Sequence, residues 1–136
     1  MKQILNYLTS EEIYGCSILI KRKEFEKFKK VIMGGVYEII ILLIMDKIGR
    51  PTYGYEISKH LDEISNGRFH LTEGTLYPIL KKLEKSGLVK SFWGESEVGP
   101  PRKYYTLTTK GRKFLEKALN FWEDIESLID KLRGEE

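Results

Sequence analysis

The sequence predicts a mainly α-helical protein with one small two-stranded β-hairpin: a winged helix-turn-helix, an N-terminal helical extension and a C-terminal dimerisation helix. Three observations predict this fold. Three helical patterns precede two short β-rich runs, which is the element order of a winged helix. A long pattern of apolar residues at heptad-like spacing follows. Basic charge is concentrated over residues 71–113, which carry nine Lys and Arg against four Asp and Glu.

Length and composition indicate one globular domain with a packed core. The 136 residues are 41% hydrophobic and 32% charged, with a net charge of +3. Cys16 is the only cysteine, which excludes an internal disulfide and a cysteine-rich metal centre and suits a reducing compartment. The longest apolar run, Ile39–Met45, is much shorter than the roughly 20 residues that a membrane span needs. With no secretory signal pattern at the start, we expect a cytoplasmic protein without membrane contact or cofactor.

Two helices are expected in the first half of the winged helix. Residues 1–33 form an extension in which 21–30 has a highly charged helical pattern. Gly34-Gly35 is expected to separate this extension from Val36–Ile48, an almost wholly apolar core helix. After a turn, Tyr53–Ile64 is expected to form a second short helix. The apolar residues expected to pack it on the core are Tyr55, Ile57 and Leu61.

The third helix carries the most informative pattern. Thr72 is a good N-cap and Thr75 an alternative, while Pro78 favours a start at Thr75 or a bent first turn. Ser86-Gly87 predicts a left-handed helix end. The expected buried face consists of Leu76, Ile79, Leu80 and Leu83, and the opposite face of Tyr77, Lys81, Lys82 and Lys85.

A hairpin and a last helix complete the prediction. The runs Leu88–Trp93 and Lys103–Thr108 read as strands joined by a long loop. Thr108 or Thr109 is expected to cap the final helix. Its apolar residues recur three and four apart, which is typical of a coiled coil and predicts self-association. They are Leu115, Ala118, Trp122, Ile125, Ile129 and Leu132.

Three strings carry a resemblance to a known family. PTYGYEI at 51–57, EGTLYPILKKLEKSGLV at 73–89 and GPPRKYYTLTTKG at 99–111 resemble the PadR family of bacterial transcriptional regulators. The resemblance covers roughly residues 34–132 and implies a winged-helix domain over 34–108 and a dimerisation helix over 109–136. It implies a homodimeric repressor that binds double-stranded DNA at an inverted-repeat operator.

The resemblance also implies where DNA is contacted. Lysines on the outward face of the third helix and cations at the end of the hairpin loop are suited to phosphates, and Gly74 permits close backbone approach. The family's contact positions, in and around the third helix and the wing, fall on Tyr53, Gly74, Thr75, Tyr77, Lys81, Lys82, Lys85, Arg102 and Lys103.

Trp122 has two interpretations. A bulky aromatic on a coiled-coil stripe is a natural dimer-core residue. The chain is also similar to smaller family members that bind flat aromatic drugs between paired C-terminal helices, with a tryptophan as stacking wall. That resemblance implies an effector site formed by Phe121, Trp122 and Ile125, and a repressor released by a small aromatic ligand or another signal.

The extension is the departure from the family's pattern. It is expected to enlarge the dimer or to add phosphate contacts through residues 21–23. Alternatively, it reflects a chain start upstream of the family's usual one, with Met33 close to the position where family members normally begin. Other readings of the whole chain are a winged helix used as a protein-docking module, which has no need for a basic face, and RNA binding. An enzyme is not expected, because His60 and His70 lack metal-ligand spacing and no nucleophile or phosphate-loop motif is present.

Overall fold

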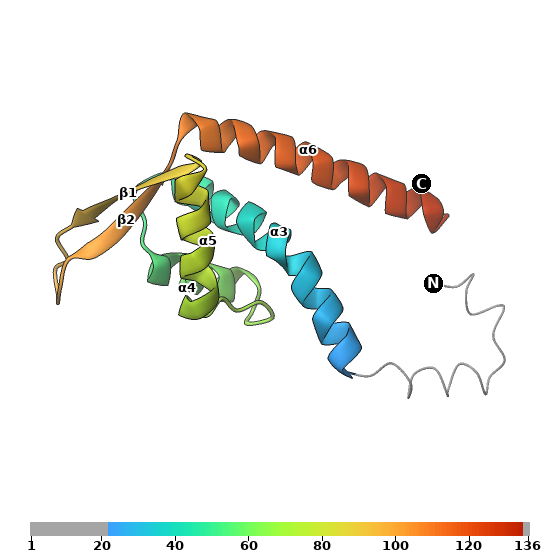
Figure 1. Cartoon of the computed structure of the whole chain (residues 1–136), viewed down its shortest axis with the longest axis horizontal. Helices are drawn as coiled ribbons and strands as arrows, with labels where there is room; N and C mark the ends of the chain where they lie inside the picture. The colour runs from blue at the N-terminus through green and yellow to red at the C-terminus, as the bar shows by residue number, and fades with distance from the viewer. Residues whose placement is uncertain (1–21, 135–136) are drawn as a thin grey trace. The chain divides into compact units, whose positions relative to one another are not determined.

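A computed structural model describes residues 22–134 of the chain and confirms a mainly helical fold with a two-stranded hairpin (Figure 1). The expectations for residues 1–21, including Cys16, lie outside the described residues. Within 22–134, no helix is apolar over a length that would cross a membrane. In chain order the elements are α3 (Arg22–Ile48), α4 (Gly54–Ile64), α5 (Glu73–Lys85), β1 (Val89–Gly94), β2 (Arg102–Leu107) and α6 (Thr109–Leu132).

The chain divides into two compact units. The core unit is Val36–Leu119 and contains α4, α5 and the hairpin, together with the end of α3 and the beginning of α6. The terminal unit consists of Met1–Gly35 and Asn120–Glu136. Its described part is therefore the first half of α3 and the second half of α6.

The glycine pair does not separate two helices, contrary to the expectation from the sequence. α3 continues without interruption from Arg22 through Gly34 and Gly35 to Ile48. Neither glycine has the positive φ that ends a helix, and a Cβ built on either one would meet nothing within 4 Å. A glycine inside a helix costs only about 1 kcal/mol. The packing of the following turns in the core, at Ile41, Leu42, Ile44 and Met45, offsets such a cost.

The core lies where α3, α4, α5 and the hairpin meet. Within α4, Ile57 and Leu61 are buried as expected, whereas Tyr55 is exposed. Within α5, Leu76, Leu80 and Leu83 are buried and Ile79 is only half-buried at the edge of this face. The remaining buried apolar side chains are Ile41, Leu42, Ile44, Met45, Leu71, Leu88, Val89, Tyr105 and Leu115.

α5 begins at Glu73 and not at Thr75, with Thr72 as its N-cap. The Thr72 carbonyl accepts the N–H groups of Thr75 (3.1 Å) and Leu76 (2.9 Å). Pro78 therefore lies inside the helix, where it cannot donate to the carbonyl of Gly74. Gly74 is exposed, so water can satisfy that carbonyl, which is why the proline is tolerated.

The end of α5 leads directly into the hairpin. Gly87 has φ +74°, the Leu88 N–H donates to the Leu83 carbonyl (2.9 Å), and the Gly87 N–H donates to the Glu84 carbonyl (3.0 Å). This is a Schellman end, as the sequence indicated. The antiparallel pairing then runs from Val89 opposite Leu107 to Gly94 opposite Arg102. Both strands differ from their expected bounds by one residue.

Thr108, and not Thr109, caps α6 and connects this helix to the end of α5. Its hydroxyl oxygen accepts the Gly111 N–H (2.9 Å) and its hydroxyl donates to the Gly87 carbonyl (2.7 Å). The Thr108 N–H donates to the Leu88 carbonyl (3.1 Å). A Cβ on Gly111 would lie 2.0 Å from that carbonyl oxygen, a distance that real atoms do not tolerate. Glycine at 111 is therefore required by packing.

Replacing Gly111 by alanine should destabilise the core unit. Because the added methyl would meet the Leu88 backbone, we expect the free energy of unfolding to fall by about 1–3 kcal/mol or more, as in other overpacked sites. Urea denaturation followed by circular dichroism measures this loss. Gly34→Ala is the control, since its surroundings are open: stability should stay constant or rise by up to about 1 kcal/mol. Equal stabilities for G111A and the original chain would refute the packing argument.

Candidate nucleic-acid interface

The face of α5 opposite its leucine row is open to solvent. Lys81 and Lys85 lie one turn apart on it, and Gly74 lies two turns before Lys81 on the same side. Within residues 22–134, neither lysine makes an ion pair. A Cβ on Gly74 would meet only the Thr72 hydroxyl, at 4.0 Å, so nothing inside the molecule requires glycine there. These three residues form an accessible surface.

Two of the other candidate cations are already paired with carboxylates. The Lys82 ammonium lies 2.5 Å from the Glu38 carboxylate on α3, and the Glu38 side chain is only 17% exposed. The Lys103 ammonium lies 3.8 Å from the Glu84 carboxylate, which also accepts a hydrogen bond from the Ser91 hydroxyl. Sequence reasoning could not find these pairs, because Glu38 and Lys82 are 44 residues apart.

Arg102 and Tyr53, distant in sequence, are brought together at the hairpin. The guanidinium lies 4.4 Å from the centre of the Tyr53 ring. Tyr53 meets Tyr104 edge to face at 5.7 Å, and Tyr104 stacks on Phe92, also at 5.7 Å. A cation over an aromatic face is attracted by the ring electrons, so Arg102 is held in position rather than free.

Backbone pairing explains why Tyr53 reaches the hairpin. Thr52 bridges to Tyr105 of β2 through two hydrogen bonds: the Thr52 N–H to the Tyr105 carbonyl (3.1 Å) and the Tyr105 N–H to the Thr52 carbonyl (2.7 Å). This pairing fixes the residue before α4 against the strand that carries Arg102. Backbone pairing in the folded core therefore positions Tyr53 beside Arg102.

Tyr77 is positioned by a glycine on α4. A Cβ on Gly54 would lie 2.9 Å from the Tyr77 hydroxyl oxygen and 3.1 Å from its ring, so the ring lies over the start of α4. The side chain nevertheless remains exposed on its other side. Thr75, on the first turn of α5, is also exposed, and its hydroxyl accepts from that of Thr72 (3.1 Å).

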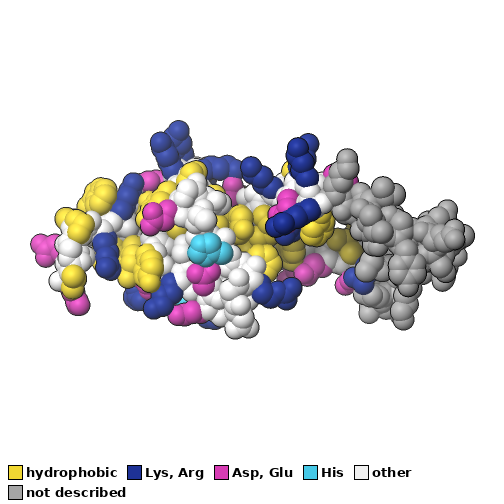
Figure 2. Space-filling model, turned by 90° about the horizontal axis from the view of Figure 1, so that it is seen from below, with side chains coloured by type: hydrophobic (Ala, Val, Ile, Leu, Met, Phe, Trp, Pro, Cys, Tyr) yellow, Lys and Arg dark blue, Asp and Glu magenta, His cyan; other side chains and the backbone are white. Residues whose placement is uncertain are grey.

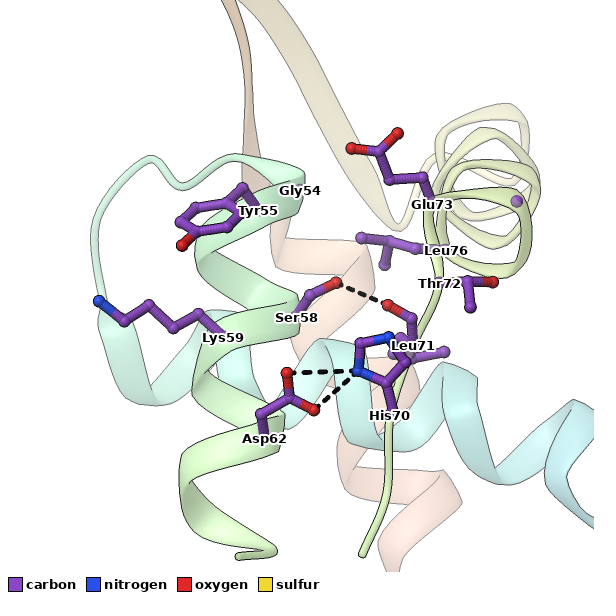
Figure 3. Close-up of a pocket in the computed structure, with 11 residues that line it drawn as sticks. Gly54, Tyr55, Ser58, Lys59, Asp62, His70, Leu71, Thr72, Glu73 and Leu76 are labelled. Carbon is purple, nitrogen blue, oxygen red and sulfur yellow. Dashed lines mark hydrogen bonds and ion pairs between the residues drawn. The ribbon is translucent and has the colours of Figure 1, made fainter. Parts of the chain in front are cut away.

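An open groove of about 560 Å³ lies between α4 and the N-terminus of α5 (Figure 3). Its floor is held by two contacts between α4 and the loop before α5. The Ser58 hydroxyl donates to the Leu71 carbonyl (3.1 Å), and Nδ1 of His70 lies 3.0 and 3.3 Å from the two Asp62 carboxylate oxygens. Among residues 22–134, no cluster of three His, Cys, Asp or Glu side chains is suited to a metal. The groove also includes Gly54, Tyr55, Lys59, Thr72, Glu73, Gly74 and Leu76.

The hairpin loop has a different chemistry from the start of β2, which follows it. Glu95 and Glu97 are exposed in the loop, beside the exposed apolar side chains of Trp93 and Val98. At the left of Figure 2, the end that carries the hairpin, apolar, acidic and basic side chains lie next to one another. The loop therefore repels phosphates, while Arg102 and Lys103, at the loop end of β2, supply the cations of the wing.

One cation near this surface was missed. Lys110, on the first turn of α6, donates to the carbonyl of Ser86 at the end of α5 (2.7 Å). It belongs to the string at 99–111, but it was not singled out from the sequence. Its position next to the exposed end of α5 could not be inferred before the packing of α6 was known.

The three candidate effector residues lie on the second half of α6, in the terminal unit. Trp122 and Phe121 are exposed and Ile125 is half-buried. The Trp122 indole N–H donates to the Glu126 carboxylate (2.8 Å), which fixes the ring along the helix. The apolar stripe is buried at Leu115 and becomes exposed toward Leu132, so its second half has an unpartnered face.

Comparison with known proteins places the chain among transcriptional regulators. Residues 40–117 match the model of the transcriptional regulator PadR-like family. An uncharacterized protein from Lysinibacillus sphaericus is 34% identical over 100 residues, which are 74% of this chain and 89% of that protein. The transcriptional regulator YqjI of Escherichia coli is 32% identical over 65% of this chain and 41% of its own length.

Solved structures agree with the sequence comparison. A PadR-like transcription factor from Bacteroides fragilis is 36% identical, with a TM-score of 0.65 over 78% of this chain and 98% of that one. A transcriptional regulator from Clostridium thermocellum is also 36% identical, with a TM-score of 0.64 over 75% of this chain and 96% of the other.

Tyr105, in the middle of β2, gives this region a measurable pH response. Burial raises the pKa of its phenol above the ordinary value, and the nearby negative charge of Glu84 adds to the shift. The folded state therefore favours the neutral phenol. Below about pH 10 the phenol is neutral in both the folded and the unfolded chain, so its titration leaves stability unchanged. Above that pH the unfolded chain ionises first, and stability falls.

Tyr105→Phe should remove this alkaline loss, because phenylalanine cannot ionise. We expect the difference in unfolding free energy between the original chain and Y105F to be constant up to about pH 9 and to turn in favour of Y105F above about pH 10. Urea denaturation at a series of pH values measures it. Tyr55→Phe is the control, because Tyr55 is exposed. Parallel curves for Y105F and the original chain would contradict the assignment.

Proposed function

The chain belongs to the PadR-like family of transcriptional regulators, and we propose that it is a sequence-specific DNA-binding repressor that acts as a homodimer. The observation that carries the proposal is the outward face of α5, where Lys81 and Lys85 are exposed and without carboxylate partners on the same side as the open Gly74. In a winged helix this is the helix that enters the major groove. Its natural partner is double-stranded DNA in the cytoplasm.

The cations divide into two groups by their present contacts. Lys81 and Lys85 have no ion pair to give up within the described chain, so they contribute most to phosphate binding. Lys82 and Lys103 are partly neutralised by Glu38 and Glu84, so their contribution is smaller. Arg102, held over the Tyr53 ring, keeps its full charge and an ordered position at the loop end of β2.

The N-terminus of α5 is better suited to base edges than to a phosphate. Glu73 places an exposed carboxylate at this helix end, which repels a phosphate but accepts hydrogen bonds from the amino group of cytosine. Gly74 and Thr75 follow, one allowing close backbone approach and the other presenting a hydroxyl. We assign sequence reading to this turn, with Tyr53 and Tyr77 at its sides.

Dimerisation follows from the unpartnered stripe on α6. Trp122, Ile129 and Leu132 are exposed in the single chain and lie at coiled-coil spacing. Two α6 helices packed along this stripe make a two-fold dimer, which matches an inverted-repeat operator. Its two α5 helices then read major grooves about one DNA turn, or roughly 34 Å, apart.

Regulation uses the same helix. A small flat aromatic ligand stacked on Trp122 and bounded by Phe121 and Ile125 changes how two α6 helices pack, which changes the spacing of the two α5 helices. A ligand shifts this equilibrium only if it binds one arrangement more tightly than the other. No catalytic step is part of this function, in keeping with a family of transcriptional regulators.

The direct test is a salt titration of binding to the promoter upstream of the chain's own gene and to a scrambled duplex of equal length. We expect tighter binding to the promoter and a loss of affinity for both as salt rises. Equal affinities would contradict sequence reading. Absence of binding to either duplex at low salt would overturn the proposal in favour of a protein-docking module.

The two groups of cations should differ in the same titration. Lys81→Ala and Lys85→Ala should each weaken binding to both duplexes and reduce the salt slope by about 1. Lys82→Ala should have a smaller effect because Glu38 already neutralises its ammonium. Glu38→Gln, which frees Lys82, should strengthen binding and steepen the slope. Weaker binding by E38Q, with its fold unchanged by circular dichroism, would contradict this division.

Gly74→Ala should separate stability from DNA binding. Because a Cβ there would meet only the Thr72 hydroxyl, at 4.0 Å, alanine should leave the unfolding free energy unchanged or raise it by up to about 1 kcal/mol. Affinity for the promoter should nevertheless fall, since the methyl keeps the DNA away from the helix. Gly34→Ala, on α3, is the matched control and should bind like the original chain. Unchanged promoter affinity for G74A would show that close backbone approach is not used.

The effector site should be visible by tryptophan fluorescence. In a Trp93→Phe background Trp122 is the sole tryptophan, and planar aromatic compounds should quench its emission in a saturable manner. The same compounds should weaken promoter binding, and Trp122→Leu should abolish that response while retaining the dimer. Emission that stays constant across a panel of such compounds would argue against the site.

A further inference from the structure

Three aromatic rings on one face of the hairpin form a continuous stack that ends at Arg102. Phe92 lies on Tyr104 with the two ring planes 18° apart, and Tyr104 meets the Tyr53 ring edge to face at 79°. The Arg102 guanidinium lies 4.4 Å from the centre of the Tyr53 ring. Strand pairing places Phe92 opposite Tyr104 and Gly94 opposite Arg102, so all four residues share one face of the sheet. Phe92, Tyr104 and Tyr53 are called the aromatic stack below.

Tyr104 can lie in the aromatic stack because residue 94 has no side chain. A Cβ on Gly94 would lie 2.9 Å from two carbons of the Tyr104 ring and 3.8 Å from the Phe92 ring. Carbon atoms in favourable contact are about 3.5–4.0 Å apart, so any side chain at 94 would push the Tyr104 ring away. Gly94 does not have a positive φ, so the backbone conformation does not require glycine there. Room for the Tyr104 ring is what requires it.

The aromatic stack lies outside the buried core of the hairpin. The core side of the two strands holds Val89 and Tyr105, whereas Phe92 is 47% exposed. Arg102 is exposed as well, and within residues 22–134 it makes no ion pair with a carboxylate. The stack therefore orders a cation without neutralising its charge, which suits a partner that carries fixed negative charges.

Order in a guanidinium matters when the partner is a phosphate. Arginine binds phosphate most strongly through two parallel N–H donors, and this geometry requires the plane of the guanidinium to be fixed. A freely rotating arginine loses its rotamer freedom when it binds, which weakens the affinity. Because Arg102 already rests on the Tyr53 ring, part of this ordering is present before a partner arrives.

We propose that Phe92 and Gly94 are positioning residues for DNA binding, which act through the aromatic stack on Arg102 without touching DNA themselves. Phe92 and the space at Gly94 keep Tyr104 in place, Tyr104 keeps the Tyr53 ring in place, and that ring fixes the guanidinium plane of Arg102 for a bidentate phosphate contact. The inference rests on the proposed DNA-binding function and deepens it, because it assigns a role to two uncharged residues of the wing.

A salt titration of promoter binding separates positioning from charge. Phe92→Ala should weaken binding about three- to tenfold at every salt concentration, as expected when one side chain must be ordered on binding. Its salt slope should equal that of the original chain, because the charge of Arg102 is retained, whereas Arg102→Ala should reduce the slope by about 1. Phe92→Tyr keeps the stack and should bind like the original chain. Equal losses for F92Y and F92A would overturn the proposal.

A double-mutant cycle tests whether the effect passes through Arg102. In an Arg102→Ala background, Phe92→Ala should cause little further loss of affinity, because the side chain that it positions is already absent. Gly94→Ala leaves every side chain of the stack in place but displaces the Tyr104 ring, so it should reproduce both the loss and its dependence on Arg102. Circular dichroism checks that each variant is folded. Losses that multiply in the double variants would contradict positioning, since a general structural role does not need Arg102.

Nuclear magnetic resonance of the chain without DNA reports on Arg102 directly. The ring current of Tyr53 should displace the Arg102 side-chain N–H resonance from its position in an unstructured peptide. F92A and G94A should move this resonance toward the unstructured position. Trp93→Ala is the matched control, because Trp93 is the next residue of β1 and its side chain lies on the other face of the hairpin. An Arg102 resonance that F92A leaves unchanged would overturn the proposal.

The inference and the proposed function fail in different ways. If the original chain binds its promoter while F92A and G94A bind equally well, the positioning role is wrong and the repressor stands. If the original chain binds neither the promoter nor the scrambled duplex at low salt, the proposed function is wrong, and the role of Phe92 in DNA binding falls with it.

Discussion

The carbonyl of Leu88 is the point on which the core unit depends. It accepts the Thr108 N–H and lies so close to α6 that only a glycine fits at position 111. On one side of this carbonyl α5 has just ended in its Schellman turn, and on the other β1 begins. The Thr108 hydroxyl completes the junction by capping α6 and binding the Gly87 carbonyl. The end of α5, the base of the hairpin and the start of α6 therefore form one rigid body, so a change at the beginning of α6 is carried to α5.

Local counter-charges decide which cations of this rigid body are available to a partner. Five cations were expected to act alike, but Glu38 and Glu84 hold Lys82 and Lys103. Arg102 is ordered by an aromatic ring instead, which positions its charge without cancelling it. The hairpin loop adds to this effect, because Glu95 and Glu97 place negative charge next to the loop end of β2, where Arg102 lies. In the proposed function, orientation on DNA thus comes from where negative charge blocks contact as much as from where positive charge attracts it.

The periodic parts of the fold were predictable and the tertiary parts were not. Three- and four-residue spacing was enough to predict the buried leucines of α5 and the stripe of α6. The expected helix end at Gly34-Gly35 was wrong. Glycine lowers helix propensity, but it ends a helix only where it adopts a positive φ, and neither glycine does so. Pro78 misled because the exposed Gly74 carbonyl tolerates the loss of a donor. The pairing of Lys82 with Glu38, and of Arg102 with Tyr53, had no local signal, since each joins elements that only the packed core brings together.

The central claim is that two copies of this rigid body present their α5 helices to the same face of DNA. Hydroxyl-radical footprinting of the promoter with the full-length chain tests it most directly. The account predicts two protected segments on each strand, related by an inverted repeat and centred about one helical turn, or roughly 10 base pairs, apart. A single protected segment without a symmetric counterpart, or uniform protection that ignores sequence, would contradict it.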